Sequence, residues 1–388
     1  MIVKPKVKGF ICTTAHPTGC AQNVREQVDY VKRMGAFDGP KRALIIGAST
    51  GFGLASRISA SFGSGAATIG VSYEKLPTEK KTATPGWYNT VAFDKLAHDE
   101  GLYSKSINGD AFSNEVKKAT IELIKKDLGK IDLIIYSIAS PRRTDPMTGI
   151  THSSVLKPTK ESYSNKTIDF ITGAMSQVTI EPAKEEEINN TVKVMGGEDW
   201  KLWLEALDKE DLLEEGAITI AYSYIGPELT FPVYRDGSIG RAKEHLEATA
   251  HELTDQLQNK GVKAYVSVNK ALVTQASSAI PVVPLYISIL YKIMKEKDIH
   301  EGCIEQMYRM YKDKIYIPLI ESDAKGRIRL DDWEMRQDVQ AEVDKIWNIV
   351  SEDNKNRYID LDGYSQEFYK LFGFGIDGVD YDEDVDII

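Results

Sequence analysis

Short apolar segments recur along residues 41–269, and longer stretches with helical spacing of apolar residues separate them. The segments are residues 41–47, 67–74, 102–110, 130–139, 217–225 and 262–269. Several of them are apolar without strict alternation, which is typical of strands that are covered on both faces. Strands that alternate with helices predict an α/β fold built on a doubly wound parallel sheet.

A polar stretch between Pro141 and Gly216 interrupts this alternation. It contains turn signals, two potential small strands and an acidic run at residues 185–187. We interpret it as an insertion on the sheet, either a lid or a flanking subdomain. After Lys297 the chain is helical and then strongly acidic, and we expect its end, DYDEDVDII, to be a solvated tail.

Composition and charge narrow the class of protein. Hydrophobic residues make up 42% of the 388 residues and charged residues 27%, which are ordinary proportions for a globular chain. Its 58 acidic and 48 basic side chains leave a formal net charge of −10, which disfavours binding to nucleic acid. Three scattered cysteines are too few for a disulfide framework and favour a reducing compartment, the cytoplasm.

No segment predicts a membrane span or a secretory signal. The first 20 residues lack an uninterrupted apolar core. The most apolar run, Ala279 to Met294, is shorter than the ~20 residues that a span requires, and it contains Pro281 and Pro284. We expect it to be a buried helix or a pocket wall. Cys12, His16 and Cys20 are evenly spaced, but no second cluster completes a tetrahedral metal site, so we expect no metal.

A glycine-rich turn follows the first apolar segment and precedes the helical stretch LASRISASF. Its residues are Gly47, Ala48, Ser49, Thr50, Gly51, Phe52 and Gly53. Glycines at such a strand-to-helix turn let the backbone approach a pyrophosphate, and the helix N-terminus offers N–H groups to the anion. The spacing differs from the usual G-x-G-x-x-G, so a simple tight turn is the alternative.

Glu74 ends the second apolar segment, where a dinucleotide-binding fold places an acidic residue against the adenosine ribose. A carboxylate there accepts the ribose hydroxyls and repels a 2′-phosphate, so we expect NADH rather than NADPH. The alternative is a surface glutamate paired with Lys75. Residues at the ends of the third and fourth segments should lie beside the adenine and ribose, namely Asp110, Ala111, Ile138 and Ala139.

Tyr234 and Lys243 are the candidate catalytic pair. On one continuous helix they would face opposite sides, because nine residues at ~100° each amount to two and a half turns. The turn signal at Asp236 and Gly237 instead places Tyr234 before a helix that Ser238 would cap. Both side chains can then reach one cleft, where the ammonium group would lower the pKa of the phenol.

Tyr224 ends the fifth apolar segment and is a second candidate donor for a carbonyl oxygen. Core packing is the alternative for Tyr224 and equally for Tyr222, since alternation along a strand places both on the same face.

Several long motifs in order resemble the trans-2-enoyl-CoA reductase and type V enoyl-acyl-carrier-protein reductase family. They are HPTGC, GASTGFGLASRI, TPGWYN, SIASPRRTDP, MGGEDW, IAYSYIGPE, the Tyr-x8-Lys pair and SVNKALVTQASSAIPVVPLY, and they span nearly the whole chain. The resemblance implies an enlarged Rossmann-like fold related to the short-chain dehydrogenases. It also implies that NADH reduces the C2–C3 double bond of an enoyl thioester in fatty acid metabolism.

The resemblance also implies roles for individual residues. Gly47 to Phe52 would hold the pyrophosphate, Tyr73 and Glu74 the ribose, and Asp110, Ala111, Ile138 and Ala139 the adenine side. Leu272, Val273 and Thr274 would hold the nicotinamide, Tyr224 the substrate and Lys243 the cofactor, with Tyr234 as proton donor. Arg241 departs from the family pattern, in which a second lysine is frequent at this position.

We expect one large domain with five parts. These are an N-terminal extension (residues 1–40), a dinucleotide-binding half (41–140), the insertion (141–216), a catalytic half with the substrate loop (217–297) and a C-terminal extension (298–388). Residues 279–294 would supply apolar surface for the acyl chain, and the resemblance points to a monomer.

Two other functions stay open. A short-chain carbonyl dehydrogenase usually has tyrosine and lysine four residues apart on one helix, which is not the spacing here. A dinucleotide-binding sensor without turnover is the other alternative. The carrier of the acyl group also stays open, because an acyl carrier protein would need basic docking residues such as Arg142 or Arg143, and CoA phosphates could use the same residues.

Overall fold

A seven-stranded parallel sheet forms the centre of the computed structural model, which describes residues 1–9, 11–278 and 280–388. The strand order is β13-β12-β11-β6-β3-β4-β5, so the chain winds outward in both directions from β3 and confirms the predicted doubly wound sheet. The strands are β3 (Arg42–Ile46), β4 (Ala67–Ser72), β5 (Ser104–Asn108), β6 (Ile131–Tyr136), β11 (Leu213–Ser223), β12 (Lys263–Val268) and β13 (Ile328–Arg329).

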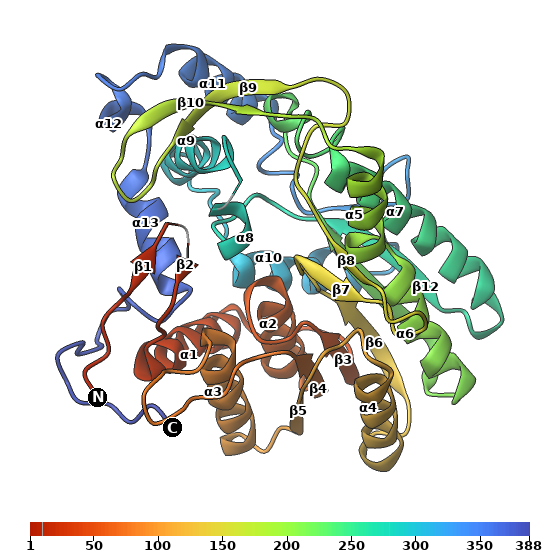
Figure 1. The fold of residues 1–388 in the computed structure, drawn as a ribbon. Helices are drawn as coiled ribbons and strands as arrows, with labels where there is room; N and C mark the ends of the chain where they lie inside the picture. Colours follow the sequence, from red (N-terminus) through yellow and green to blue (C-terminus); the bar gives the residue numbers. More distant parts are fainter. Residues whose placement is uncertain (10, 279) are drawn as a thin grey trace.

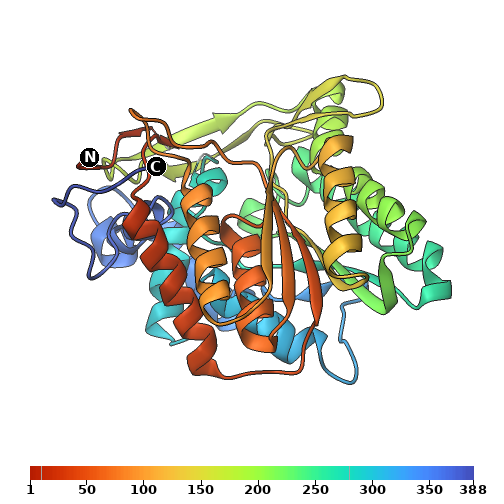
Figure 2. The same ribbon diagram turned by 90° about the horizontal axis from the view of Figure 1, so that it is seen from below.

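Helices cover both faces of the sheet (Figures 1 and 2), which explains the unbroken apolar runs. In β3, Leu44 and Ile46 pack toward α4 (Asn114–Asp127), α6 (Glu198–Lys209) and α7 (Ser238–Gln256). Ala43 and Ile45 pack on the opposite side. The helices there are α1 (Pro17–Met34), α2 (Gly51–Ile58), α3 (Pro85–Asp99) and α10 (Cys303–Arg309).

A third layer lies beyond the carboxyl ends of the strands and is centred on α9 (Val283–Glu296) (Figure 1). Nearly every side chain of α9 is buried, which confirms the prediction of a buried helix for the apolar run, whose first residue, Ala279, lies outside the described residues. Val282 precedes the helix with a φ of 76°, a rare backbone conformation for a β-branched residue. The elements around α9 are β9 (Tyr163–Ile168), β10 (Met175–Ile180), α8 (Gln275–Ser278), α11 (Gln337–Ile349), α12 (Lys355–Tyr358) and α13 (Leu361–Lys370).

Residues 141–216 contain more structure than the two small strands that the sequence predicted. They form two hairpins, β7–β8 (Arg142–Thr144 and Thr151–Ser153) and β9–β10, followed by α5 (Glu185–Met195) and α6. Helix α6 belongs to the helix layer of the sheet, because its Trp200 and Trp203 are fully buried there. The range that we expected as one insertion therefore combines surface hairpins with a core helix.

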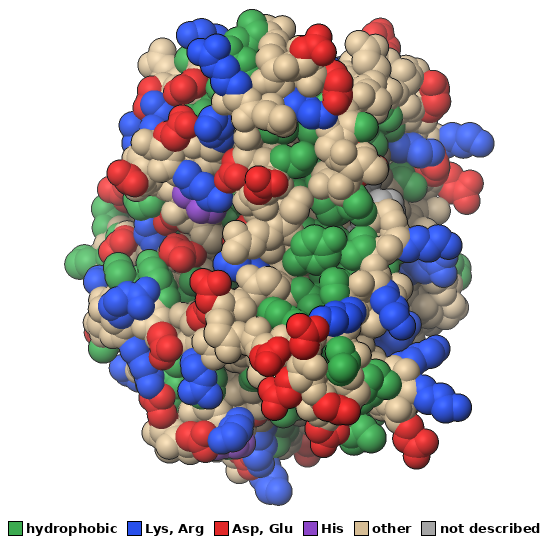
Figure 3. All heavy atoms as spheres, turned by 90° about the vertical axis from the view of Figure 1, so that its left-hand side faces the viewer, with side chains coloured by type: hydrophobic (Ala, Val, Ile, Leu, Met, Phe, Trp, Pro, Cys, Tyr) green, Lys and Arg blue, Asp and Glu red, His purple; other side chains and the backbone are tan. Residues whose placement is uncertain are grey.

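The acidic end of the chain is solvated along its acidic side chains, as predicted, with Asp382 86% and Asp384 82% exposed, but its backbone is docked on the protein. Ile387 is 5% exposed, and its carbonyl oxygen accepts a hydrogen bond of 2.7 Å from the hydroxyl of Tyr88. Asp382 pairs with Lys4 and Asp384 with the N-terminal amine, beside the small hairpin β1–β2 (Val7–Lys8 and Ile11–Cys12). Acidic and basic side chains mix on this face of the molecule (Figure 3).

None of the helices in the described ranges is long and apolar enough to cross a membrane.

A buried ion pair links α4 to α6 and should contribute strongly to stability. Lys117 Nζ lies 2.7 Å from Asp199 Oδ1, and both side chains are buried. We expect Lys117→Met to lower the free energy of unfolding by about 3–5 kcal/mol, because it leaves a buried carboxylate without its cation. Urea denaturation measures the change. Lys125→Met on the exposed side of α4 is the matched control, and an equal loss in both variants would contradict the argument.

Candidate active site

The carboxyl edge of the sheet gathers the residues that the sequence singled out. The turn at residues 47–52 follows β3, Tyr73 and Glu74 follow β4, and the other groups follow β5, β6, β11 and β12 in turn. Because every strand pair in this sheet is parallel, all these strands end at the same edge. The predicted residues therefore come together although they span more than half of the sequence.

The glycine-rich turn allows two backbone segments to approach closely. A Cβ at Gly47, whose φ is 89°, would lie 2.0 Å from the carbonyl oxygen of Ser137, in the segment after β6. A Cβ at Gly53 would lie 1.9 Å from the carbonyl oxygen of Gly47. Helix α2 begins at Gly51, so its first N–H groups point to this edge. The arrangement fits a pyrophosphate.

Glu74 is held at the edge by neighbouring polar groups. Its Oε1 accepts a hydrogen bond of 2.5 Å from Ser49 Oγ, and its N–H donates to Asn108 Oδ1 at 2.7 Å. Among the described residues no ion pair joins Glu74 to Lys75, so the structure does not support the alternative of a surface glutamate paired with that lysine. Tyr73 is 78% exposed and stands at the rim. A carboxylate fixed beside the glycine turn fits the two hydroxyls of a ribose.

The predicted adenine-side residues differ in exposure. Asp110 Oδ1 accepts a hydrogen bond from the N–H of Phe112, which shapes the turn after β5. Ala111 is buried, and its carbonyl oxygen accepts from Lys117 Nζ at 2.9 Å and from Trp203 Nε1 at 3.1 Å. After β6, Ile138 is half-buried and Ala139 is exposed. The main chain at this side of the edge is therefore firmly fixed.

Lys243 lies in the second turn of α7, and its Nζ donates to the carbonyl oxygen of Tyr222 at 2.9 Å. Burial lowers the pKa of Lys243 to about 8, against the smaller opposing effect of Glu247. Ser238 is the first residue of the helix and not its cap, which corrects our expectation; the capping position is Gly237. Ser238 Oγ donates instead to the carbonyl oxygen of Val155 at 2.5 Å.

Tyr234 lies before α7, as expected, and is buried against Tyr224. The two rings meet edge to face with centroids 4.8 Å apart. Burial raises the pKa of Tyr234, and Tyr364 and Glu334 raise it further. The expectation that Lys243 lowers this pKa is therefore wrong for the protein without ligands. The groups that shift the pKa of Tyr234 are its apolar surroundings, Tyr364 and Glu334, whereas the ammonium group of Lys243 is bound to the carbonyl oxygen of Tyr222.

The structure distinguishes the roles of Tyr222 and Tyr224, which alternation along the strand could not separate. The hydroxyl of Tyr222 forms a hydrogen bond of 2.5 Å with Ser56 Oγ, and its ring packs on Phe52, so it supports α2 from the core. The hydroxyl of Tyr224 donates to Glu334 Oε1 at 3.1 Å. Tyr224 therefore belongs to the edge and Tyr222 to the packing beneath it.

Glu334 is a residue of this site that the sequence did not reveal. It is fully buried, and burial raises the pKa of its carboxyl group. In the sequence it stands in RLDDWEMRQ, among other acidic residues and far from any motif, so no local pattern distinguishes it.

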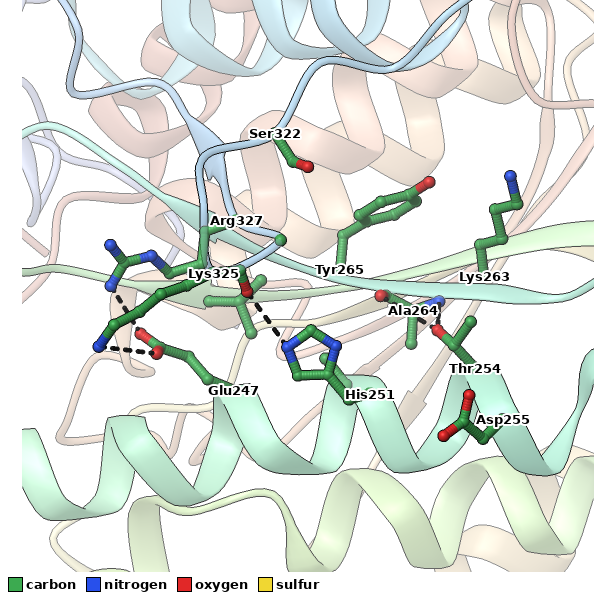
Figure 4. Close-up of a pocket in the computed structure, with 13 residues that line it drawn as sticks. Glu247, His251, Thr254, Asp255, Lys263, Ala264, Tyr265, Ser322, Lys325 and Arg327 are labelled. Atoms are coloured by element: carbon green, nitrogen blue, oxygen red, sulfur yellow. Dashed lines mark hydrogen bonds and ion pairs between the residues drawn. The ribbon is translucent and has the colours of Figure 1, made fainter.

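A cavity of about 310 Å³ opens beside Tyr224 and Lys243 and contains Phe231, Arg327 and Met335 in its wall. A second hollow of about 170 Å³ continues along α7 (Figure 4). There Glu247 faces Lys325 and Arg327, and His251 Nε2 lies 3.2 Å from the carbonyl oxygen of Lys325. The charged groups of this second hollow largely satisfy one another, whereas the first cavity reaches two predicted site residues.

Segment 272–274 follows β12 and is fixed by hydrogen bonds. The N–H of Val273 donates to the hydroxyl of Tyr291 at 3.0 Å, and the N–H of Thr274 donates to Ser277 Oγ at 2.8 Å. Leu272 and Val273 are buried in the same cluster as Tyr234. The predicted nicotinamide segment therefore lies in the same part of the protein as the predicted proton donor.

Comparison with known families agrees with this geometry. The family model described as the trans-2-enoyl-CoA reductase catalytic region matches residues 81–316. The chain belongs to the trans-2-enoyl-CoA reductase family. A model described as the NAD(P)H binding domain of trans-2-enoyl-CoA reductase matches residues 2–79.

Relatives of this family match along almost their entire length. The enoyl-[acyl-carrier-protein] reductase [NADH] of Flavobacterium johnsoniae is 63% identical over 99% of this chain and 97% of that protein. The trans-2-enoyl-CoA reductase [NADH] of Ruminiclostridium cellulolyticum is 59% identical over 100% of this chain and 98% of that protein.

Solved structures show the same fold. The trans-2-enoyl-CoA reductase of Treponema denticola, solved in complex with NAD, is 53% identical, with a TM-score of 0.96 over 99% of this chain and 98% of that chain. The enoyl-acyl carrier protein reductase of Bacillus cereus is 17% identical with a TM-score of 0.50 over 76% of this chain and 96% of that chain, and shows a shared fold alone.

A third family model, described as an enoyl reductase FAD binding domain, matches residues 322–385. The residues present there do not fit a flavin. The large side chains that this segment turns inward pack in one cluster with α9, and so they occupy the interior themselves. These side chains are Val339, Val343, Ile346, Trp347, Tyr364, Phe368 and Phe372.

Glu74→Ala should weaken NADH binding by about 10- to 100-fold, because hydrogen bonds to a charged group contribute about 1.5–3 kcal/mol. The preference for NADH over NADPH should shrink with it. Fluorescence titration with both dinucleotides measures the change, and Glu79→Ala, at an exposed carboxylate on the same loop, is the control. An unchanged preference would remove Glu74 from the ribose site.

NADH binding should weaken as the pH rises through about 8. The pKa of Lys243 is lowered to about 8, so the ammonium group is present at pH 7 and lost above that value. Lys243→Arg keeps its charge across this range and should abolish the step. Titrations of NADH between about pH 6.5 and 9.5 test this, and a step that persists in Lys243→Arg would assign it to another group.

Proposed function

We propose that this protein uses NADH to reduce the C2–C3 double bond of trans-2-enoyl thioesters to the saturated acyl thioester. The observation that carries the proposal is the meeting of a pyrophosphate-type glycine turn and a buried tyrosine pair at one edge of the sheet. Membership of the trans-2-enoyl-CoA reductase family supports it, as do relatives whose names specify NADH.

Two tyrosines supply the hydrogen bonds that the reaction requires. Bound NADH supplies a hydride to C3 of the substrate, which places negative charge on the thioester oxygen. Tyr234 donates a hydrogen bond to that oxygen, and Tyr224 turns its single hydroxyl proton from Glu334 to the same oxygen when the substrate binds, which stabilises the charge as it develops. Burial raises the pKa of Tyr234, so its phenol stays neutral and keeps its hydrogen bond to the enolate oxygen. A proton taken up at C2 then completes the saturated thioester.

Lys243 and segment 272–274 position the cofactor. The Lys243 ammonium already lies at the edge, held by the carbonyl oxygen of Tyr222, where it binds the nicotinamide ribose. Leu272, Val273 and Thr274 face the nicotinamide from a loop that Tyr291 and Ser277 fix. Asp110, Ala111, Ile138 and Ala139 enclose the adenine side.

The acyl chain lies against the third layer of the fold. Tyr234 belongs to the same buried cluster as α9 and the residues that precede it, including Ile280 and Val282. These side chains give an apolar surface beside the reacting double bond and exclude water from it.

The carrier of the acyl group is CoA or acyl carrier protein, both of which present the same phosphopantetheine thioester. Arg143 does not serve for docking, because it is 2% exposed and pairs with Glu198 at 2.6 Å. Arg142 is exposed and stays a candidate contact. We place the enzyme in the cytoplasm as a monomer of fatty acid biosynthesis; its three cysteines are free thiols, which fits a reducing compartment.

Tyr234→Phe should lower kcat with crotonyl-CoA by at least about 100-fold, the range for loss of a positioned proton donor, with little change in NADH binding. Loss of NADH absorbance measures turnover. Tyr222→Phe removes a hydroxyl from the core and should retain most of the activity.

The same assay separates the alternatives. Oxidation of NADH by ketones but not by crotonyl-CoA would indicate a carbonyl dehydrogenase. NADH binding without oxidation would indicate a sensor, and near-normal turnover by Tyr234→Phe would remove that tyrosine from the mechanism.

A further inference from the structure

Glu334 links Tyr224 to the loop after β12 through a single buried carboxylate. Its Oε1 accepts hydrogen bonds from the hydroxyls of Tyr224 at 3.1 Å and Tyr286 at 2.6 Å. Its Oε2 accepts from the N–H of Ala271 at 2.7 Å. One side chain therefore fixes the predicted substrate tyrosine and the residue directly before segment 272–274.

The peptide groups around Ala271 are unusually well held. The N–H of Ala271 is bound by Glu334, and its carbonyl oxygen accepts from Lys270 Nζ at 3.0 Å. Both of these charged side chains are buried. The polypeptide that leads to the nicotinamide segment is thus clamped between a carboxylate and an ammonium group.

Glu334 is itself rigidly placed. Gln340 Nε2, from α11, donates to the carbonyl oxygen of Glu334 at 2.7 Å and to the hydroxyl of Tyr286 at 3.3 Å. A buried carboxylate is costly compared with an apolar side chain of similar size, so packing alone does not account for a glutamate at this position.

We propose that Glu334 is a positioning residue for the reduction. It holds the phenol of Tyr224 in register with segment 272–274 while the site is empty, and the phenol proton turns from Glu334 to the substrate oxygen when the substrate binds. This role rests on the proposed function. It differs from a structural role because it makes the effect of Glu334 on turnover depend on the hydroxyl of Tyr224.

A double-mutant cycle tests this dependence, with Glu334→Gln, Tyr224→Phe and the combined variant. The Gln side chain keeps the size and an acceptor for Ala271, but its amide donates where the carboxylate accepted from the phenols. We expect Glu334→Gln to lower kcat about tenfold, the scale of one charge-assisted hydrogen bond, with NADH affinity and thermal midpoint close to those of the wild type. In the Tyr224→Phe background the same change should cost less than about twofold.

Asp331→Asn is the matched control. Asp331 is a buried carboxylate in the same segment that pairs with Arg329 and not with Tyr224, and its variant should keep a normal kcat. Independent, multiplicative losses from Glu334→Gln and Tyr224→Phe would overturn the proposal, as would an unchanged kcat in Glu334→Gln.

Turnover by the wild-type enzyme distinguishes a failure of the proposed function from a failure of the role of Glu334. No oxidation of NADH by wild type with crotonyl-CoA would overturn both. Normal wild-type turnover together with multiplicative losses would overturn the role of Glu334 alone.

Discussion

The close approach of two backbone turns is the constraint on which the site depends. β3 and β6 are neighbours in the sheet, so the turn after β3 meets the segment after β6, and a Cβ at Gly47 would collide with the carbonyl oxygen of Ser137. Only a residue without a side chain permits this contact at a positive φ. The contact lies four residues before the start of α2 at Gly51, the helix N-terminus that we propose for the dinucleotide.

Burial then determines the chemistry at that edge. The third layer around α9 removes water from Tyr224 and Tyr234, which stabilises the neutral phenols, and burial also lowers the pKa of Lys243 on α7. The neutral phenol of the proposed proton donor and a cation that titrates near pH 8 thus both result from burial. Neutral phenols at this edge fit the proposed reaction, in which negative charge develops on the substrate oxygen only during hydride transfer.

Local sequence patterns predicted the strands, the glycine turn and the separation of Tyr234 from Lys243 by a turn, because apolar runs and turn residues act over a few positions. They failed where a distant segment decides the outcome. Glu334 reaches Tyr224 from 110 residues away, and the acidic tail docks only because Tyr88 and the N-terminus receive it. The raised pKa of Tyr234 likewise reflects tertiary burial, for which the sequence gives no local sign.

The backbone at Val282, at the start of the layer over the site, is strained. A β-branched residue in the left-handed region costs about 1–3 kcal/mol, and it persists here because fixed neighbours on both sides leave it no alternative, including the hydroxyl of Thr167, which accepts from its N–H at 3.2 Å. Turning Val282 to an extended conformation would break this hydrogen bond, so the strain persists only while β9 stays in contact with the start of α9. The path of the chain into α9 is therefore set by its contact with β9 and not by the local conformational preference of a valine.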